Sequence, residues 1–255
     1  QLAQALRSFD LRGLRVAALG GGTGLSRITG GDSRRSEWRD QPFTGLKEIF
    51  PNLSNIVCVT VDVGSTGEML KDFPLISLGD IRHVLLSAVR SATLRELYHL
   101  DEDKARLTAA ALHSLFNFRF NLPPDSPEQL WKQSGAAPEL LPAPLASFLS
   151  DLVRRLFSDQ RLKMSLQRPQ CLGNLLIAAA VYSKLPAFFR IAELIANQKR
   201  LQAATLDGIN DLAHALGAGR NAVLPCALTS ARLQVLYANG VQVTGEAKAG
   251  AAERG

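Results

Sequence analysis

Four glycines stand within five residues directly after an apolar run, a pattern typical of an anion-binding turn. The segment Gly20–Ser26 reads GGGTGLS and follows the apolar residues Leu14–Leu19. Glycine lets backbone N–H groups approach a phosphate closely, and a helix N-terminus adds about half a positive charge. The hydroxyls of Thr23 and Ser26 supply further donors. We therefore expect a phosphate site here; the alternative is a tight strand-to-helix turn without a ligand.

The glycine segment does not fit two common nucleotide-binding motifs. Leu25 stands where the third glycine of GxGxxG would be, and the GK[ST] ending of a Walker A loop is absent. These departures disfavour an NAD-dependent dehydrogenase and a P-loop NTPase.

Polar residues also follow the second apolar run of the sequence. Asp62 ends the expected strand, and Ser65 and Thr66 lie between Gly64 and Gly67. In an open parallel sheet, ligands bind in the crevice outside the carboxyl ends of the strands. Asp62 can therefore accept hydrogen bonds from a ligand hydroxyl or hold a divalent cation. The alternative is that Asp62 caps a turn and the Ser-Thr-Gly segment is a linker.

Two further segments place polar residues at expected helix starts. Asp80, after Gly79, is expected first as an N-cap. Arg82 follows in the first turn, where a cation opposes the helix dipole and needs an anionic ligand or a partner carboxylate. Asn174, after Gly173, opens an apolar helix, either as its cap or as a ligand contact.

Alternating strand and helix patterns predict an α/β fold with a mostly parallel sheet. A strand, a helix and a strand over the first sixty residues predict a βαβ unit with a right-handed crossover. Asn239-Gly240 predicts a tight hairpin turn near the C-terminus. The expected strands are Leu14–Leu19 (buried), Asn55–Asp62, Val223–Ala227, Leu233–Tyr237 and Val241–Thr244. The expected helices start near Leu25 and cover Phe43–Phe50, Ile81–Leu97, Ala105–Leu115, Pro144–Phe157, Leu172–Ser183, Phe188–Asn197 and Leu206–Leu216, with a lead-in helix over 1–13 and a frayed tail over 247–255.

Composition and charge disfavour several classes of protein. The formal charge of +6 over 255 residues favours acidic ligands, but the charged stretch Gly30–Gln41 mixes both signs and is interpreted as a solvated loop. Only 6% of residues are aromatic, which disfavours nucleic-acid binding. Three cysteines argue against a disulfide framework, and no apolar run reaches the ~20 residues of a membrane span. We expect a cytoplasmic protein without nucleic-acid or membrane partners.

Five motifs, in this order, resemble the CofD-like family, and most of all its gluconeogenesis-factor branch. Residues 20–26 match the family's GGGTGLS, and 62–67 are similar to its Asp-rich Gly-Ser-Ser-Gly loop. Residues 79–83 are similar to GDIRN, 170–180 to HSxGNLLLAAL, and 223–246 to a VLP…DG…GE stretch. The resemblance covers about residues 14–116 and 170–246. The family's Asp-Asp pair is reduced to Asp62 followed by Val63, and its His-Ser is Gln170-Cys171.

The resemblance implies a three-layer Rossmann-like fold in a single domain, 1–255. It implies a helical insertion at 117–168, a C-terminal β-hairpin and a missing C-terminal family segment. It also implies a homodimer that binds a nucleotide sugar such as UDP-N-acetylglucosamine and regulates carbon metabolism, cell-wall synthesis and cell shape. The transferase branch moves a 2-phospholactyl group from a guanosine diphosphate donor to a deazaflavin with Mg²⁺. Leu25-Ser26 favours the nucleotide-sugar branch, since the transferase branch tends to carry Gly-Ala there. A third alternative is a scaffold that has lost its ligand.

The predicted site joins all of these segments. Asp62 and Asp80 are its catalytic candidates, and Asp62 is also its metal ligand if the protein is a transferase. The predicted ligand-binding residues are Gly20, Gly21, Gly22, Thr23, Gly24, Leu25, Ser26, Asp62, Ser65, Thr66, Gly67, Gly79, Asp80, Arg82, Gly173 and Asn174.

Overall fold

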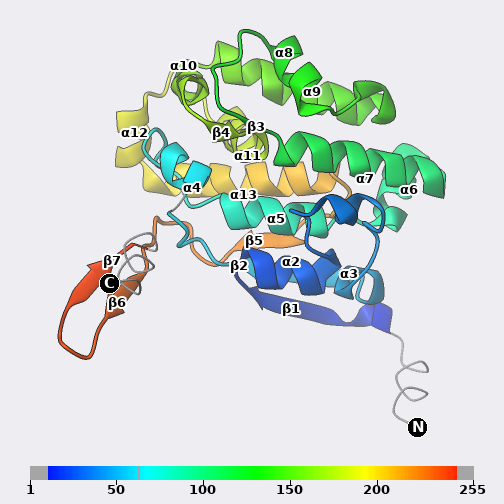
Figure 1. Cartoon of the computed structure of the whole chain (residues 1–255), viewed down its shortest axis with the longest axis horizontal. Helices are drawn as coiled ribbons and strands as arrows, with labels where there is room; N and C mark the ends of the chain where they lie inside the picture. The colour runs from blue at the N-terminus through cyan, green and yellow to red at the C-terminus, as the bar shows by residue number, and fades with distance from the viewer. Residues whose placement is uncertain (1–10, 63, 246–255) are drawn as a thin grey trace.

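A parallel three-stranded sheet organises the fold (Figure 1). The computed structural model describes residues 11–62 and 64–245. The strands β1 (Arg15–Gly20), β2 (Asn52–Val57) and β5 (Val223–Pro225) are all parallel and lie in the order β1-β2-β5. Gly20 pairs with Val57 and Val57 with Pro225, so the three carboxyl ends meet at one edge. The predicted α/β class and the parallel βαβ unit are confirmed.

Helices make up most of the rest of the described chain. The first half contains α2 (Gly22–Gly30), α3 (Leu46–Ile49), α4 (Gly64–Met69), α5 (Gly79–Ser87), α6 (Ser91–Tyr98) and α7 (Glu102–Asn117). The second half contains α8 (Pro127–Ser134), α9 (Ala143–Ser158), α10 (Gln160–Lys163), α11 (Leu172–Ser183), α12 (Ile191–Ala196) and α13 (Gln198–Ala215). The short strands β3 (Arg119–Phe120) and β4 (Gln170–Cys171) pair antiparallel. The helices α8, α9 and α10 lie within the segment 117–168.

The centre of the core is α11, whose residues Leu172–Tyr182 are all buried. A helix that is apolar on every side must be surrounded by other elements, and α5, α7, α9 and α13 contact it. Gly208 lets α13 approach closely, because a Cβ there would lie 2.6 Å from the Val181 backbone nitrogen. The prediction of this helix matched its observed bounds.

Two strand predictions were wrong in part. β1 was expected to be buried. Its residues instead alternate between exposed and partly exposed, and Leu19 is 71% exposed. The reason is that β1 is the edge strand of the sheet, with α2 on its inner side (Figure 1). The second strand was expected over Asn55–Asp62 but ends at Val57, so Asp62 lies beyond it in an irregular segment.

Helix boundaries differ from expectation at several places, among them α13, which starts at Gln198 and not at Leu206. The segment Gly64–Gly67 was predicted as a loop but forms the start of α4. The single helix predicted over Ile81–Leu97 is interrupted at Ala88–Arg90, giving α5 and α6. The helix predicted over Phe43–Phe50 is only the short α3. Local glycine and serine content misled the prediction at Gly64–Gly67, since packing overrides propensity in short segments.

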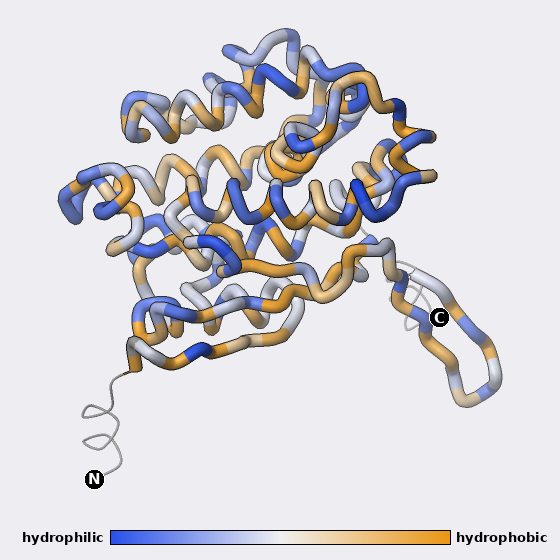
Figure 2. The backbone as a smooth tube through the Cα atoms, turned by 180° about the vertical axis from the view of Figure 1, so that it is seen from behind, coloured by the Kyte–Doolittle hydropathy of each residue, from blue (hydrophilic) through white to orange (hydrophobic). Residues whose placement is uncertain are grey.

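A C-terminal hairpin stands away from the body of the molecule (Figure 2). β6 (Gln234–Leu236) and β7 (Gln242–Thr244) pair antiparallel around Asn239-Gly240, as predicted. Gly240 has a φ of 82°, which favours glycine. The predicted tail 247–255 and most of the lead-in 1–13 fall outside the described residues. Within the described ranges, no helix combines the length and hydropathy that a bilayer crossing requires.

Candidate functional site

Three helices begin at the same edge of the sheet, where the parallel strands end. α2 starts at Gly22, directly after β1, and α5 starts at Gly79. α11 starts at Leu172. In the described part of the chain, no side chain caps any of these three helices, and the one carboxylate in their first turns is Asp80. Because each N-terminus carries about half a positive charge, the edge has a positive field that favours an anion.

The starts of α2 and α5 pack directly on one another. A Cβ at Gly22 would lie 2.3 Å from the Asp80 Oδ1 atom and 2.9 Å from the Asp80 Cα atom, so only glycine fits. The Asp80 carboxylate therefore lies beside the first turn of α2. Asp80 was expected as the N-cap of α5, but that cap is Leu78 and makes no side-chain bond to the helix.

The glycine segment has an inward and an outward side. Gly22, Leu25 and Ser26 are buried, and the Ser26 hydroxyl donates to the Thr23 carbonyl at 3.2 Å. By contrast, Gly24 is exposed, and no atom of the described residues lies within 4 Å of a Cβ built there. A ligand can therefore reach the backbone at Gly24, while the Leu25 and Ser26 side chains belong to the core.

The side chain of Asn174 connects α11 to α4 and α5. The Asn174 amide is buried; it donates to the Ser65 hydroxyl at 3.1 Å and to the Thr66 hydroxyl at 3.5 Å. Its oxygen accepts a hydrogen bond from the Arg82 Nε atom at 3.0 Å. Asn174 was predicted as a cap or a ligand contact, and the structure shows instead an amide whose bonds hold three helix starts together.

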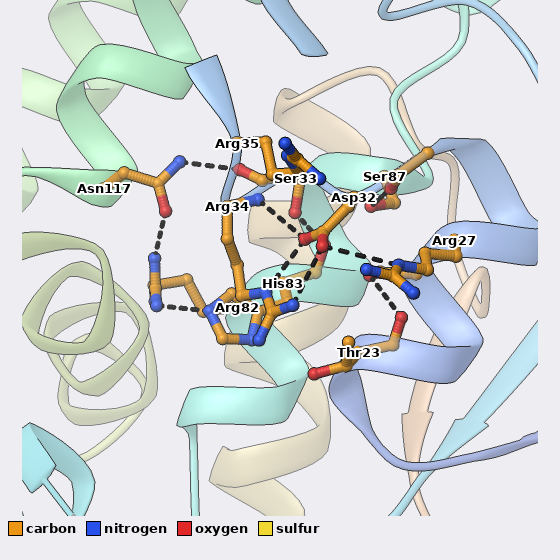
Figure 3. A network of polar contacts seen from close by, with 12 residues as sticks. Thr23, Arg27, Asp32, Ser33, Arg34, Arg35, Arg82, His83, Ser87 and Asn117 are labelled. Atoms are coloured by element: carbon orange, nitrogen blue, oxygen red, sulfur yellow. Dashed lines mark hydrogen bonds and ion pairs between the residues drawn. The ribbon is translucent and has the colours of Figure 1, made fainter. Parts of the chain in front are cut away.

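Arg82 is buried among neutral hydrogen-bond acceptors (Figure 3). Its Nη1 atom donates to the Phe116 carbonyl at 3.1 Å and to Asn117 Oδ1 at 2.5 Å. Gly173 makes room for this side chain, because a Cβ there would lie 2.6 Å from Arg82 Cδ. Burial lowers the pKa of the guanidinium, and the charge of Arg119 lowers it further. Arg82 was expected to have a carboxylate or a ligand anion as partner, and none of its bonds to described residues is to a carboxylate.

His83 completes this arrangement as a neutral acceptor. Arg82 Nη2 lies 2.5 Å from His83 Nε2, and a guanidinium has only donors, so the imidazole accepts. Burial, followed by the charges of Arg82 and Arg34, lowers the pKa of His83 to about 2. Within the described chain, the buried Nδ1 atom of His83 has no hydrogen-bond partner.

Asp62 lies at a second part of the site, beside a cavity of about 600 Å³. A Cβ at Gly245 would come within 2.8 Å of the Asp62 carboxylate. Its wall comes from the segment after α4, from the start of α13 and from residues 228–232, and it includes the apolar Leu70, Phe73, Leu75 and Leu201 and the cations Lys71 and Arg232. Asp62 and Gly67 line this cavity, whereas Gly20–Ser26, Asp80, Arg82 and Asn174 do not.

The described residues do not assemble a metal site. Asp80 faces Gly22 while Asp62 faces Gly245. No group of three His, Cys, Asp or Glu side chains suited to a metal occurs within residues 11–62 and 64–245. Mg²⁺ is commonly held by one or two carboxylates together with substrate phosphates and water. Asp62 and Asp80 are the carboxylates predicted for that role, and we derive no step through a metal.

Sequence reasoning missed several residues at the site. Asp32, Ser33, Arg34, His83 and Asn117 all join the network in Figure 3. Ser33 and Arg34 belong to the charged stretch that was interpreted as a solvated loop, so mixed charges hid their role. The one sequence feature that pointed to this network was His83, which directly follows Arg82 in the motif at 79–83.

Comparison with known proteins identifies the family. The family model described as 2-phospho-L-lactate transferase CofD matches residues 16–254. A curated protein of Nostoc sp. (strain PCC 7120), named "Putative gluconeogenesis factor", is 31% identical over 109 residues, which are 43% of this chain and 17% of that protein. Two solved structures of a Bacillus halodurans protein of the UPF0052 family are 20% identical, with TM-scores of 0.45 and 0.44. They match 93% and 92% of this chain but 48% and 47% of their own, so the chain spans about half the length of these solved relatives. The chain therefore belongs to the CofD family.

Proposed function

We propose that this chain binds a nucleotide sugar, with UDP-N-acetylglucosamine as the expected example, and that the diphosphate lies at the N-terminus of α2. The observation that carries the proposal is the meeting of the uncapped starts of α2, α5 and α11, whose first turns contain one carboxylate. Exposed backbone at Gly24 gives a phosphate access to this field.

The cavity beside Asp62 supports the placement of the remainder of the ligand. Its volume of about 600 Å³ falls within the usual range of small-molecule sites. The Asp62 carboxylate on its wall is a suitable acceptor for sugar or ribose hydroxyls. The ligand would then extend from the start of α2 across the start of α4 toward Asp62.

The proposed role is regulatory. The Nostoc relative's name refers to gluconeogenesis, and a nucleotide-sugar sensor of this kind would link carbon metabolism to cell-wall synthesis. Because the chain spans only part of its relatives, this role is proposed for the longer proteins through the domain described here.

Isothermal titration with UDP-N-acetylglucosamine, UDP-glucose, UDP and GDP tests the proposal, together with two variants at Gly24. Gly24→Asp adds a carboxylate to the first turn of α2, where nothing lies within 4 Å of the new Cβ. The charge is favourable for the helix but repels a bound phosphate, so we expect binding to weaken at least about tenfold. Gly24→Asn has nearly the same shape without the charge and should bind within about threefold of the wild type.

Absence of heat for every nucleotide would contradict the proposal and favour a scaffold that has lost its ligand. Equal binding by Gly24→Asp and the wild type would show that the nucleotide binds elsewhere.

A second candidate function is the transferase that the family model's description names. It would use the cavity beside Asp62 for a deazaflavin acceptor and the start of α2 for a guanosine diphosphate donor. Turnover of such a donor in the presence of Mg²⁺, lost in Asp62→Asn, would favour this candidate over the binding protein.

A further inference from the structure

A loop that sequence reasoning treated as solvent-exposed is fixed onto the site. The Ser33 hydroxyl donates to the His83 carbonyl at 2.7 Å, and the Asn117 amide donates to the Ser33 carbonyl at 2.8 Å. His83 and Asn117 both contact the Arg82 guanidinium. The next residue, Arg34, is therefore held beside Arg82, and Figure 3 shows its guanidinium between Asp32 and His83.

Asp32 holds two arginines, one on each side. Arg34 donates to it through Nε and Nη2, both at 2.8 Å, and Arg27 Nε lies 3.5 Å away. The bond from Arg34 holds the pKa of the Asp32 carboxyl well below its usual range. Arg34 Nη1 is not used in these bonds, and the side chain is 40% exposed. A guanidinium fixed on one side and open on the other can bind an oxyanion.

Arg34 and Arg27 differ in the groups that lie near their charges. Arg34 lowers the pKa of His83 and of Arg82, and Asp80 helps to raise the pKa of Arg34, although the bond to Asp32 is its main cause. Arg27 directly follows the glycine segment, in the last turn of α2, and its side chain is 59% exposed. The bonds of Ser33 to His83 and Asn117 hold Arg34 on the side of Arg82, and Arg27, which shares Asp32, is the matched control.

We propose that Arg34 binds the second phosphate of a diphosphate ligand whose first phosphate lies at the start of α2. The inference rests on the proposed function and adds the residue that selects a diphosphate over a monophosphate. Three guanidiniums (Arg34, Arg82 and Arg119) and two carboxylates (Asp32 and Asp80) act on this region. With about half a positive charge from each start of α2, α5 and α11, the region carries an excess of positive charge, which favours an anionic ligand.

The test compares diphosphates with monophosphates. Isothermal titration would measure the Kd of UDP, UMP, GDP and GMP for the wild type, Arg34→Gln and Arg27→Gln at one salt concentration. We expect Arg34→Gln to weaken diphosphate binding about 10- to 100-fold, the range for a charge-assisted bond. Monophosphate binding should change less than about threefold, and Arg27→Gln should leave both within about threefold. Arg34→Lys should give an intermediate loss, because it keeps the charge without the fork.

The outcomes separate the two proposals. If the wild type binds nucleotides, two results overturn the role of Arg34 and leave the proposed function standing. One is an equal loss of mono- and diphosphate affinity in Arg34→Gln. The other is the same loss of diphosphate affinity in Arg27→Gln. Absence of nucleotide binding by the wild type overturns both. Thermal melting of each variant checks its fold, and if Arg34→Gln does not fold, the diphosphate-selective loss must appear in Arg34→Lys.

Discussion

The two ends of α2 both combine glycines with charged side chains, but the N-terminal end is open to solvent and the C-terminal end is tightly packed. At the N-terminal end, the backbone is exposed at Gly21 and Gly24, and the Asp80 carboxylate lies beside Gly22. At the C-terminal end, Gly30 is buried against the Ser87 carbonyl and the Lys47 ammonium. One end keeps polar groups within reach of solvent, whereas the other is closed by packing.

The buried cations at these two ends show the difference most clearly. Arg82 has four acceptors, from Asn174, Phe116, Asn117 and His83. Among the described residues Lys47 has one acceptor, the Pro42 carbonyl at 2.5 Å, and it otherwise faces the rings of Trp38 and Phe43 at 5.7 and 5.9 Å. A satisfied buried cation positions other groups, while a poorly satisfied one mainly costs stability.

The largest loss of stability is expected from a substitution at Gly30, at the packed end of α2. A Cβ there would lie 2.0 Å from the Ser87 carbonyl oxygen, a backbone atom that cannot move aside. We expect Gly30→Ala to lower the free energy of unfolding by about 3 kcal/mol, measured by urea denaturation. A loss below about 1 kcal/mol would show that the C-terminal end of α2 is not tightly packed.

A pH-dependent effect is expected at Lys47. Burial lowers its pKa to about 7, below its unfolded value, while the charge of Glu48 opposes the shift. Below pH 7 both states hold the proton, and the folded state bears the full cost of the buried charge. Between about pH 7 and 10.5 the unfolded state binds more protons, so stability rises with pH.

Lys47→Met should therefore stabilise the protein at pH 7 and below, by on the order of a few kcal/mol, and the gain should vanish near pH 10.5. Denaturation curves at several pH values measure this. Lys104→Met, at an exposed lysine, should change stability by less than about 0.5 kcal/mol throughout. A gain or loss that is constant with pH would contradict the buried-charge account.

The smallest effect is expected at Gly24. Nothing lies within 4 Å of a Cβ at this position, so Gly24→Ala should stabilise α2 by about 0.5–1 kcal/mol in urea denaturation. Destabilisation similar to that of Gly30→Ala would mean that the two ends of α2 do not differ in packing.

The sequence predicted elements best where one physical signal dominated. The run Leu172–Ser183 is uncharged and mostly apolar, so it is stable only when it is buried in the core. The observed α11 has the same bounds. The start of α4 was missed because Gly-Ser-Thr-Gly favours a loop locally, and its helix depends on contacts such as that between Asn174 and Ser65. The exposure of β1 was missed because the order of strands is not encoded in the strand itself.

The site could be predicted in its glycine-marked segments and not in its long-range contacts. Gly22, Asp80, Arg82 and Asn174 lie together as their motifs suggested. The partners of Arg82 at Phe116 and Asn117 are more than thirty residues away in the sequence, and no local pattern marks them. Which groups satisfy a buried guanidinium is decided by tertiary packing alone.

The most direct test of the central claim is an amide ¹H–¹⁵N correlation spectrum recorded during titration with UDP-N-acetylglucosamine. If the diphosphate binds at the N-terminal end of α2, the amide signals of Gly21, Gly22 and Gly24 shift, while those of Gly30 and Gly45, at the closed end, remain in place. Saturable binding with equal shifts at both ends, or with no shift at Gly22 and Gly24, would contradict the account.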